Sequence, residues 1–430
     1  MLMAFEIFSI KRLTIRGFIL QIVLMIMPGH AAEYSLENVL KVTATHNDNI
    51  ELLSTGGRSI QGQTIESKII GKVAGAAWDS SLNLDLSLNT FNLSEYDSDD
   101  QIVTWSMNKK TELQTFGLDL NAIRDSTRTS EQDTSGLVTN SAVIREVYSV
   151  APKWTYSVSD RSYISVNAKI SETKYGSDRF TNYNYDSINV NFTRDLDDKT
   201  RIAVKLSGSD YRSEEQASLY LGTFELGIKT ESASYGVQVG AESSLTEAWS
   251  LSGFIGSTYT EQIYQLRDPD NACNAPALES LNLKPSICSK EDFSNSNFTA
   301  DLSTSWSGER SGLQLSYSIQ NQPSSQGYEV ESELVRVDWN YNMTEKGLFK
   351  SGLKYGKNRT ADSSAVDIGS GNNSRDFASI DINYVYRATR HLKLDINYIY
   401  RWQDKRLLLG DADSNTVSMG INYQPAKSIW

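Results

Sequence analysis

The stretch from Phe377 to Arg401 carries one phrase twice, and this repeat decides the fold class. Ile380-Asp-Ile-Asn-Tyr-Val-Tyr-Arg387 is followed, after a six-residue gap, by Leu394-Asp-Ile-Asn-Tyr-Ile-Tyr-Arg401. In each copy, aliphatic residues and tyrosines alternate with mostly polar residues, which is the period-2 pattern of a β-strand. Because the gap is short and polar, the two copies are predicted to pair as an antiparallel hairpin.

The tyrosines of this hairpin indicate its surroundings. They lie at the C-terminal end of each copy, so an antiparallel pair places them at opposite edges of the sheet. Aliphatic residues bounded on both sides by aromatic residues are typical of a strand face that contacts lipid, with the polar face turned to a water-filled lumen. A soluble antiparallel sheet with one wet face is the alternative that the hairpin alone leaves open.

The first residues have the pattern of an export signal. Lys11, Arg12 and Arg16 precede a short apolar run, Gly17–Met27, and small residues follow up to Ala32. The run is too short for a good transmembrane helix and matches a cleaved secretory signal peptide. We therefore expect residues 1–32 to be a signal peptide and residues 33–430 to form the barrel.

Composition agrees with a β-barrel in the outer membrane. Only 39% of the residues are hydrophobic, which suits strands that are apolar on one face. The chain has 7 Pro, so long strands can run without interruption, and its 22 Tyr and 8 Trp can supply interfacial girdles. The net charge of -12 argues against a nucleic-acid partner.

Alternating segments continue along the whole chain without a domain boundary. They predict an all-β, antiparallel, up-and-down transmembrane barrel of 18 strands, with 16 as the alternative. The count is 18 if Ser213–Leu245, which can contain one strand or two, contains one membrane strand. A soluble solenoid would need a fixed short repeat, which the chain lacks. The predicted strands are Leu36–His46, Ile60–Ala74, Leu82–Leu88, Ile102–Met107, Leu113–Arg124, Val143–Val158, Tyr163–Thr173, Tyr183–Arg194, Arg201–Tyr211, Tyr235–Leu245, Trp249–Tyr259, Phe298–Trp306, Leu313–Ile319, Leu334–Tyr341, Leu348–Tyr355, the two halves of the repeat, and Thr416–Tyr423.

Connections alternate between short turns and long loops. Short ones include Ser159–Arg161 and Ala388–Arg390, and long ones include Asp125–Asn140, Tyr264–Ser296 and Lys357–Ser374. This alternation is the outer-membrane barrel pattern, and we expect the long loops to face outward. Cys273 and Cys288 lie in the longest loop, and a disulfide is the natural expectation for an exported chain. A metal site is the weaker alternative, because no His lies near.

Charged residues on the polar faces are candidates for the lumen, where rings of charge tune selectivity. They mix signs, so they predict neither cation nor anion preference. The candidates are Arg124, Arg145, Lys169, Lys205, Arg336, Asp381, Arg387, Lys393, Asp395 and Arg401.

Evidence for catalysis is thin, and the chain is not predicted to be an enzyme or to need a cofactor. His46 lies near Asp48 and could form a dyad, whereas His391 falls in a short turn at the opposite end, and no nucleophile motif accompanies either. The acidic segments Asp97–Asp100 and Arg267–Asp270 lack the ligand pattern of a calcium loop, so no metal site is predicted.

Three phrases together resemble a known family. They are Asn47-Asp-Asn-Ile50, Asp125-Ser-Thr-Arg-Thr-Ser-Glu131 and Val150-Ala-Pro-Lys-Trp-Thr-Tyr156, the last leading to Val158-Ser-Asp-Arg161, Tyr175 and Tyr185-Asp186. This set resembles an outer-membrane β-barrel porin family often found with exopolysaccharide gene clusters. The resemblance implies an outer-membrane barrel that serves as a conduit in export of a surface polysaccharide. It carries over no binding residues.

The leading function hypothesis is therefore a porin-like channel in the bacterial outer membrane. Its expected partners are outer-membrane lipid, polysaccharide and periplasmic export proteins. The second hypothesis is a structural or adhesive barrel with a closed lumen and binding loops. The third is a barrel enzyme that uses His46.

Overall fold

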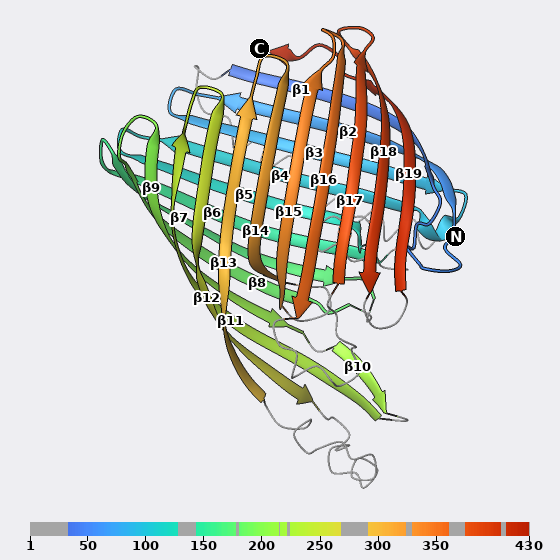
Figure 1. Ribbon diagram of the computed structural model, residues 1–430, viewed down its shortest axis with the longest axis horizontal. Helices are drawn as coiled ribbons and strands as arrows, with labels where there is room; N and C mark the ends of the chain where they lie inside the picture. The colour runs from blue at the N-terminus through green and yellow to red at the C-terminus, as the bar shows by residue number, and fades with distance from the viewer. Residues whose placement is uncertain are drawn as a thin grey trace.

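The chain folds as one closed antiparallel β-barrel in the computed structural model, which describes residues 33–127, 143–177, 180–214, 216–221, 224–267, 291–323, 329–360, 375–405 and 410–429. An 18-strand wall runs in chain order, and the last wall strand pairs with the first to close it (Figure 1). The wall strands are β1 (Glu33–Asn47), β2 (Ile60–Ala74), β3 (Trp78–Phe91), β4 (Ser98–Lys110), β5 (Gln114–Ser126), β6 (Ile144–Ser159), β7 (Ser162–Tyr175), β8 (Tyr183–Asp195), β9 (Thr200–Ser213), β11 (Phe224–Ser244), β12 (Trp249–Arg267), β13 (Glu291–Ser307), β14 (Ser311–Pro323), β15 (Glu329–Asn342), β16 (Gly347–Thr360), β17 (Arg375–Arg387), β18 (Leu392–Lys405) and β19 (Gly410–Tyr423).

The segment that the sequence left ambiguous contains one wall strand, β11, which pairs with β9 and β12. The short strand β10 (Gln216–Leu221) pairs only with the first residues of β11, outside the wall. The two-residue strand β20 (Ser428–Ile429) follows the last wall strand and pairs with β1. The prediction of 18 wall strands is therefore confirmed, because Ser213–Leu245 contributes one of them.

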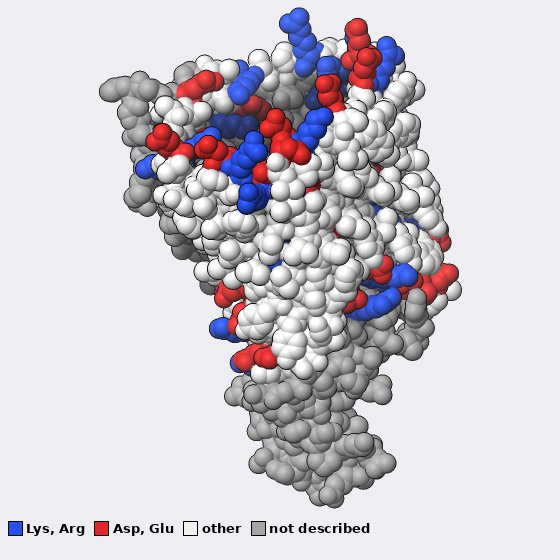
Figure 2. Space-filling view, turned by 60° about the vertical axis from the view of Figure 1, so that its left-hand side comes forward, with Lys and Arg blue, Asp and Glu red and all other residues white. Residues whose placement is uncertain are grey.

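Strand alternation sorts the side chains into two faces, as the repeat predicted. Large exposed apolar side chains occupy the same face in neighbouring strands: Tyr384 lies opposite Ile396, which in turn lies opposite Met419. Figure 2 shows charged side chains gathered toward the two ends of this surface, with a largely uncharged belt between them. A closed barrel wrapped in such a belt satisfies every wall hydrogen bond internally and exposes apolar groups to lipid.

Aromatic side chains collect on the outer face near the short turns. Trp154 stacks beside Tyr156, Trp249 lies 6.2 Å from Trp306, and Trp339 contacts both Tyr341 and Phe349. These residues come from the turn-side ends of β6, β12, β13, β15 and β16. They form the aromatic girdle expected at one membrane interface.

The two ends of the barrel differ as predicted, but the strands run further into the long connections than the sequence indicated. The segment Tyr264–Ser296 was predicted to be loop throughout, yet β12 continues to Arg267 and β13 begins at Glu291. β11 to β13 with β10 therefore project beyond the rest of the wall (Figure 1).

Inside the wall, the described residues show aromatic contacts, such as those of Tyr183 with Tyr175 and Tyr211, but little clustering of buried apolar side chains. The one buried apolar cluster among them joins Leu52 to Ala412. No helix in the described ranges is long and apolar enough to cross a membrane. The predicted signal peptide, residues 1–32, and both cysteines, Cys273 and Cys288, lie outside the described residues.

Candidate functional site: the polar inner face

The inner face of the barrel carries ion pairs between neighbouring strands. Lys68 Nζ lies 3.2 Å from Asp85, and Lys153 Nζ lies 2.5 Å from Asp119. These four side chains keep 24% to 49% of their surface exposed. Charges so exposed remain hydrated, which fits a water-filled lumen better than a packed interior.

Nine of the ten predicted lumen charges lie on this polar face by strand register. The Arg145 side chain is only 15% exposed, and its guanidinium makes two hydrogen bonds, of 2.8 and 3.0 Å, to the Asp125 carboxylate. Lys205 lies over the Phe254 ring, 3.3 Å from its centroid. The remaining seven on this face are Lys169, Arg336, Asp381, Arg387, Lys393, Asp395 and Arg401.

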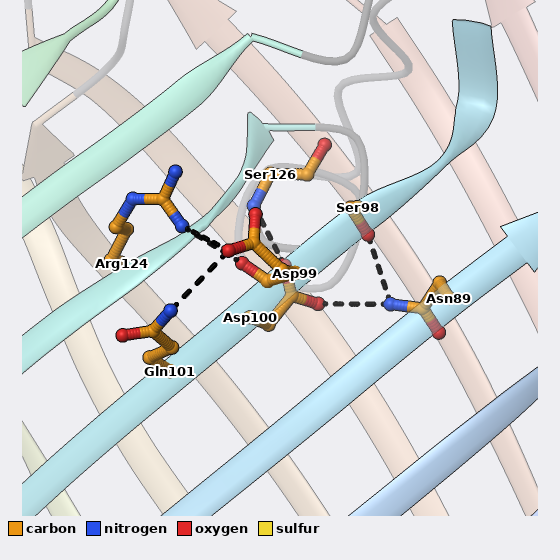
Figure 3. A network of polar contacts seen from close by, with 7 residues as sticks. All are labelled: Asn89, Ser98, Asp99, Asp100, Gln101, Arg124 and Ser126. Carbon is orange, nitrogen blue, oxygen red and sulfur yellow. Dashed lines mark hydrogen bonds and ion pairs between the residues drawn. The ribbon is translucent and has the colours of Figure 1, made fainter. Parts of the chain in front are cut away.

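Arg124 is the exception, and the prediction for it was wrong. Its Cα lies opposite Gln101 and Glu146, in the same alternation as the outward-facing Leu120. There the guanidinium binds Asp99, with 2.7 Å between Nη1 and Oδ2 (Figure 3). Both residues lie toward the long-loop ends of their strands, where the outer face has left the apolar belt.

The acidic segment Asp97–Asp100 contains no three-ligand group that could hold a metal, and no such group occurs in the described part of the chain. Its carboxylates instead accept hydrogen bonds from backbone amides and from side chains of neighbouring strands. Asp97 accepts the Phe91 amide at 2.7 Å, and Asp100 accepts hydrogen bonds from the Asn89 side chain and the Ser126 amide (Figure 3). Strand alternation turns Asp99 and Asp100 to opposite faces of the wall.

Asp48, which was suggested as the partner of His46 in a dyad, binds Asn415. The Asp48 carboxylate accepts one hydrogen bond from the backbone N–H of Asn415 at 2.7 Å and another from the side-chain amide of Asn415 at 2.8 Å. His391 lies at the short-turn end, as predicted, with its Nδ1 2.9 Å from the Gln424 carbonyl oxygen. Asp48 therefore helps to hold together the seam of the barrel, where the first wall strand, β1, pairs with the last, β19.

Sequence patterns predicted a connection between β1 and β2, but they did not predict that residues 48–59 fold onto the inner wall. The Gln403 side chain donates to the Leu52 carbonyl at 2.9 Å, and Leu52 packs against Ala412; both partners lie on the inner face. Leu52 is only 4% exposed and has a positive φ of 48°, which a branched side chain rarely adopts. The loop therefore narrows the long-loop end of the lumen beside β18 and β19.

The phrase Asn47-Asp-Asn-Ile50, quoted for the family resemblance, fastens this loop. The Asn47 side chain donates to Thr416 at 2.7 Å, across the β1–β19 seam. Asn49 donates to the carbonyls of Leu53 and Asp413 at 2.9 and 2.8 Å. The phrase could have revealed this role, because Asn and Asp side chains commonly replace backbone partners in tight connections.

The neighbouring β3–β4 connection braces the same loop. It contains the 3-10 helix η1 (Ser94–Tyr96), whose Tyr96 hydroxyl donates to Glu51 at 2.8 Å. Burial, and then the hydrogen bond and the charge of Glu51, raise the pKa of Tyr96 to about 12. Arg58 completes the contact by pairing with Glu95 and Glu51.

Taken together, the closed wall, its apolar belt and its hydrated inner face define an outer-membrane β-barrel of porin-like build. No protein-family model and no curated protein matches the sequence. Among solved structures, the unliganded ferric citrate transporter FecA is similar, with a TM-score of 0.49 and 9% identity. The match covers 91% of this chain and 64% of FecA, so the chain spans less than two thirds of that protein's length.

Two smaller barrels are also similar. OpdL from Pseudomonas aeruginosa has a TM-score of 0.40 and 9% identity, over 92% of this chain and 98% of its own. OccAB1 from Acinetobacter baumannii has a TM-score of 0.42 and 10% identity, over 91% and 97%.

Proposed function

We propose that this protein is a passive channel through which hydrophilic solutes cross the outer membrane. The observation that carries the proposal is the inner face, which is polar around the wall and keeps its ion-paired charges partly exposed. A barrel of this strand number encloses space for an aqueous path rather than a packed interior. The described residues contribute wall strands and connections to that path, and one loop narrows it.

A more specific version of the proposal is a conduit in export of a surface exopolysaccharide, working with periplasmic export proteins. It rests on the three sequence phrases that resemble the porin family. The structure gives at least one of these phrases, Asn47–Ile50, a fastening role at the seam. That role is compatible with any solute.

The second candidate is a barrel with a closed lumen and binding loops. The β1–β2 loop favours it, because this loop lies on the inner wall and is held by Gln403 and Tyr96.

Single-channel conductance in planar bilayers decides between the two. The protein should be purified folded, with folding shown by heat-modifiable migration, and tested with and without neutral and acidic oligosaccharides. A steady current supports the channel, and block by one class of sugar would name the solute. Absence of current from folded protein would overturn the channel and favour the closed barrel.

A further inference from the structure

The inner wall of β15 to β18 contains a concavity of about 990 Å³, bounded at the long-loop end by Leu52 of the β1–β2 loop. These strands lie together on one side of the barrel (Figure 1). The concavity opens to the lumen and is lined by side chains from four consecutive strands. It is large enough for a short oligomeric solute rather than for a single ion.

Basic residues dominate the charge of this concavity. Arg336, Lys350, Lys354 and Arg401 line it, against Asp338 and Asp381. We name these four cations the basic wall. Arg336 pairs with Asp338, with 2.6 Å between Nε and Oδ2, and the charged residues that line the concavity are four basic and two acidic ones.

The opposite situation holds on the inner face of β2 to β6. There three carboxylates each have a basic partner on the adjacent strand: Lys68 for Asp85, Lys153 for Asp119, and Arg145 for Asp125. The charges of these three pairs therefore cancel locally. The excess on the basic wall is the more notable because the whole chain has a net charge of -12.

Side-chain amides accompany the four cations in the lining of the concavity. Asn340, Asn383 and Asn397 line the same concavity. Amides both donate to and accept from hydroxyl groups, whereas guanidinium and ammonium groups make charge-assisted hydrogen bonds with carboxylates. The combination suits a solute that carries both hydroxyls and negative charge.

We infer that the basic wall binds a polyhydroxylated carboxylate, such as a short oligomer of uronic acid, on its way through the lumen. The inference deepens the proposed channel function and rests on it for the route by which the solute arrives. Binding itself needs only the folded barrel, so it can be tested apart from conduction.

The test is isothermal titration calorimetry on full-length protein, purified folded in detergent, at low salt. The probes are trigalacturonate, neutral maltotriose, and citrate, which has carboxylates but no sugar ring. We expect binding of trigalacturonate, none of maltotriose, and at least tenfold weaker binding of citrate. Binding of maltotriose equal to that of trigalacturonate, or no binding of trigalacturonate, would overturn the inference. Equal affinity for citrate would overturn its polyhydroxylated part.

Matched variants locate the site. The double variant Lys350→Gln with Arg401→Gln should weaken trigalacturonate binding at least tenfold. The control, Lys72→Gln with Lys169→Gln, removes the same charge from inner positions on β2 and β7 and should change binding less than twofold. Equal losses in both would show a general charge effect and overturn the site.

Conductance measured on the same samples separates the two proposals. Current without trigalacturonate binding would leave the channel standing and remove the basic wall as a site. Binding without current would leave the site standing and remove the channel.

Discussion

Two hairpins of the same wall, β17–β18 and β4–β5, distribute their charges differently. Between Ile380 and Arg401, every acidic and lysine or arginine side chain within the two strands lies on the inner face, and the outer face is aliphatic or tyrosine. In β4–β5 the ion pair between Asp99 and Arg124 lies on the outer face. The difference shows that alternation determines which face a residue occupies, whereas its position along the strand determines whether that face meets lipid or water.

The largest expected effect comes from placing a charge in the apolar belt of β18. Ile396→Arg should destabilise the folded barrel by about 2 to 4 kcal/mol, because an outer-face arginine near the bilayer midplane loses its hydration. Ile396 is 49% exposed and lies between Tyr384 and Met419 on the outer face. Urea unfolding in liposomes measures the free energy.

The control is the next residue, Asn397→Arg, which points to the lumen and should cost less than about 1 kcal/mol, as for a surface change. Equal losses for the two variants would mean that Ile396 does not face lipid.

The second effect concerns the packing of the inner face, where three glycines lie directly opposite phenylalanines. The pairs are Gly62–Phe91, Gly240–Phe254 and Gly356–Phe377. A Cβ at Gly240 would lie 2.1 Å from the Gly253 carbonyl oxygen and 2.5 Å from the Phe254 ring. Gly240→Val should therefore cost about 1 to 3 kcal/mol, the range for overpacking.

Gly71→Val is the matched control for this change. Gly71 lies on the outer face of β2, and nothing lies within 4 Å of its added Cβ. Urea unfolding should show little change. A loss as large as that of Gly240→Val would mean that backbone entropy, and not the close approach to Phe254, sets the cost.

The comparison of the hairpins also shows how far sequence could go. Predicted Ile60–Ala74 matches β2 at both ends, because turn residues bound the segment, Gly56 and Gly57 before it and Gly75 after it. At the long-loop ends alternation ceases, so Ser98–Asp100 was assigned to a loop although it opens β4, and Arg124 was assigned to the lumen. Alternation tells whether a side chain faces the lumen or the outside of the barrel. It does not tell where along the strand the apolar belt ends.

The inward fold of the β1–β2 loop could not be predicted in the same way. It depends on contacts between residues far apart in the chain, such as Leu52 with Gln403 and Asn47 with Thr416. Half of the basic wall could be predicted: Arg336 and Arg401 were predicted to face the lumen, whereas Lys350 and Lys354 were missed. Their sign excess appears only when four strands are placed side by side.

The third prediction tests the brace beside β4. Tyr96→Phe removes the hydrogen bond to Glu51 and should cost about 1.5 kcal/mol, the lower range for a hydrogen bond to a charged group. The raised pKa of Tyr96 gives a pH dependence: its contribution is complete below pH 10.0, the ordinary tyrosine pKa, and is lost as pH rises through about 12.

Urea unfolding of wild type and variant at pH 8 and at rising alkaline pH measures this contribution as the difference between the two proteins. That difference should shrink as pH rises. Tyr423→Phe, at an exposed outer-face tyrosine, is the control and should leave the difference near zero. A Tyr96→Phe penalty that stays constant to pH 12 would contradict the role of the hydroxyl.

The smallest effect is expected at Arg124, and it addresses the comparison of the hairpins directly. Arg124→Gln removes a pair whose side chains are 26% and 44% exposed, so it should cost at most about 1 kcal/mol and less in high salt. Arg145→Gln, one strand away, breaks a pair on the inner face that is only 15% and 11% exposed and leaves Asp125 without this partner. It should cost more and respond less to salt, because burial weakens screening. Urea unfolding at two salt concentrations measures the loss of stability in each variant and how strongly that loss depends on salt. If Arg124→Gln proved the costlier and the less salt-dependent, the outer end of β4–β5 would have to lie within the membrane.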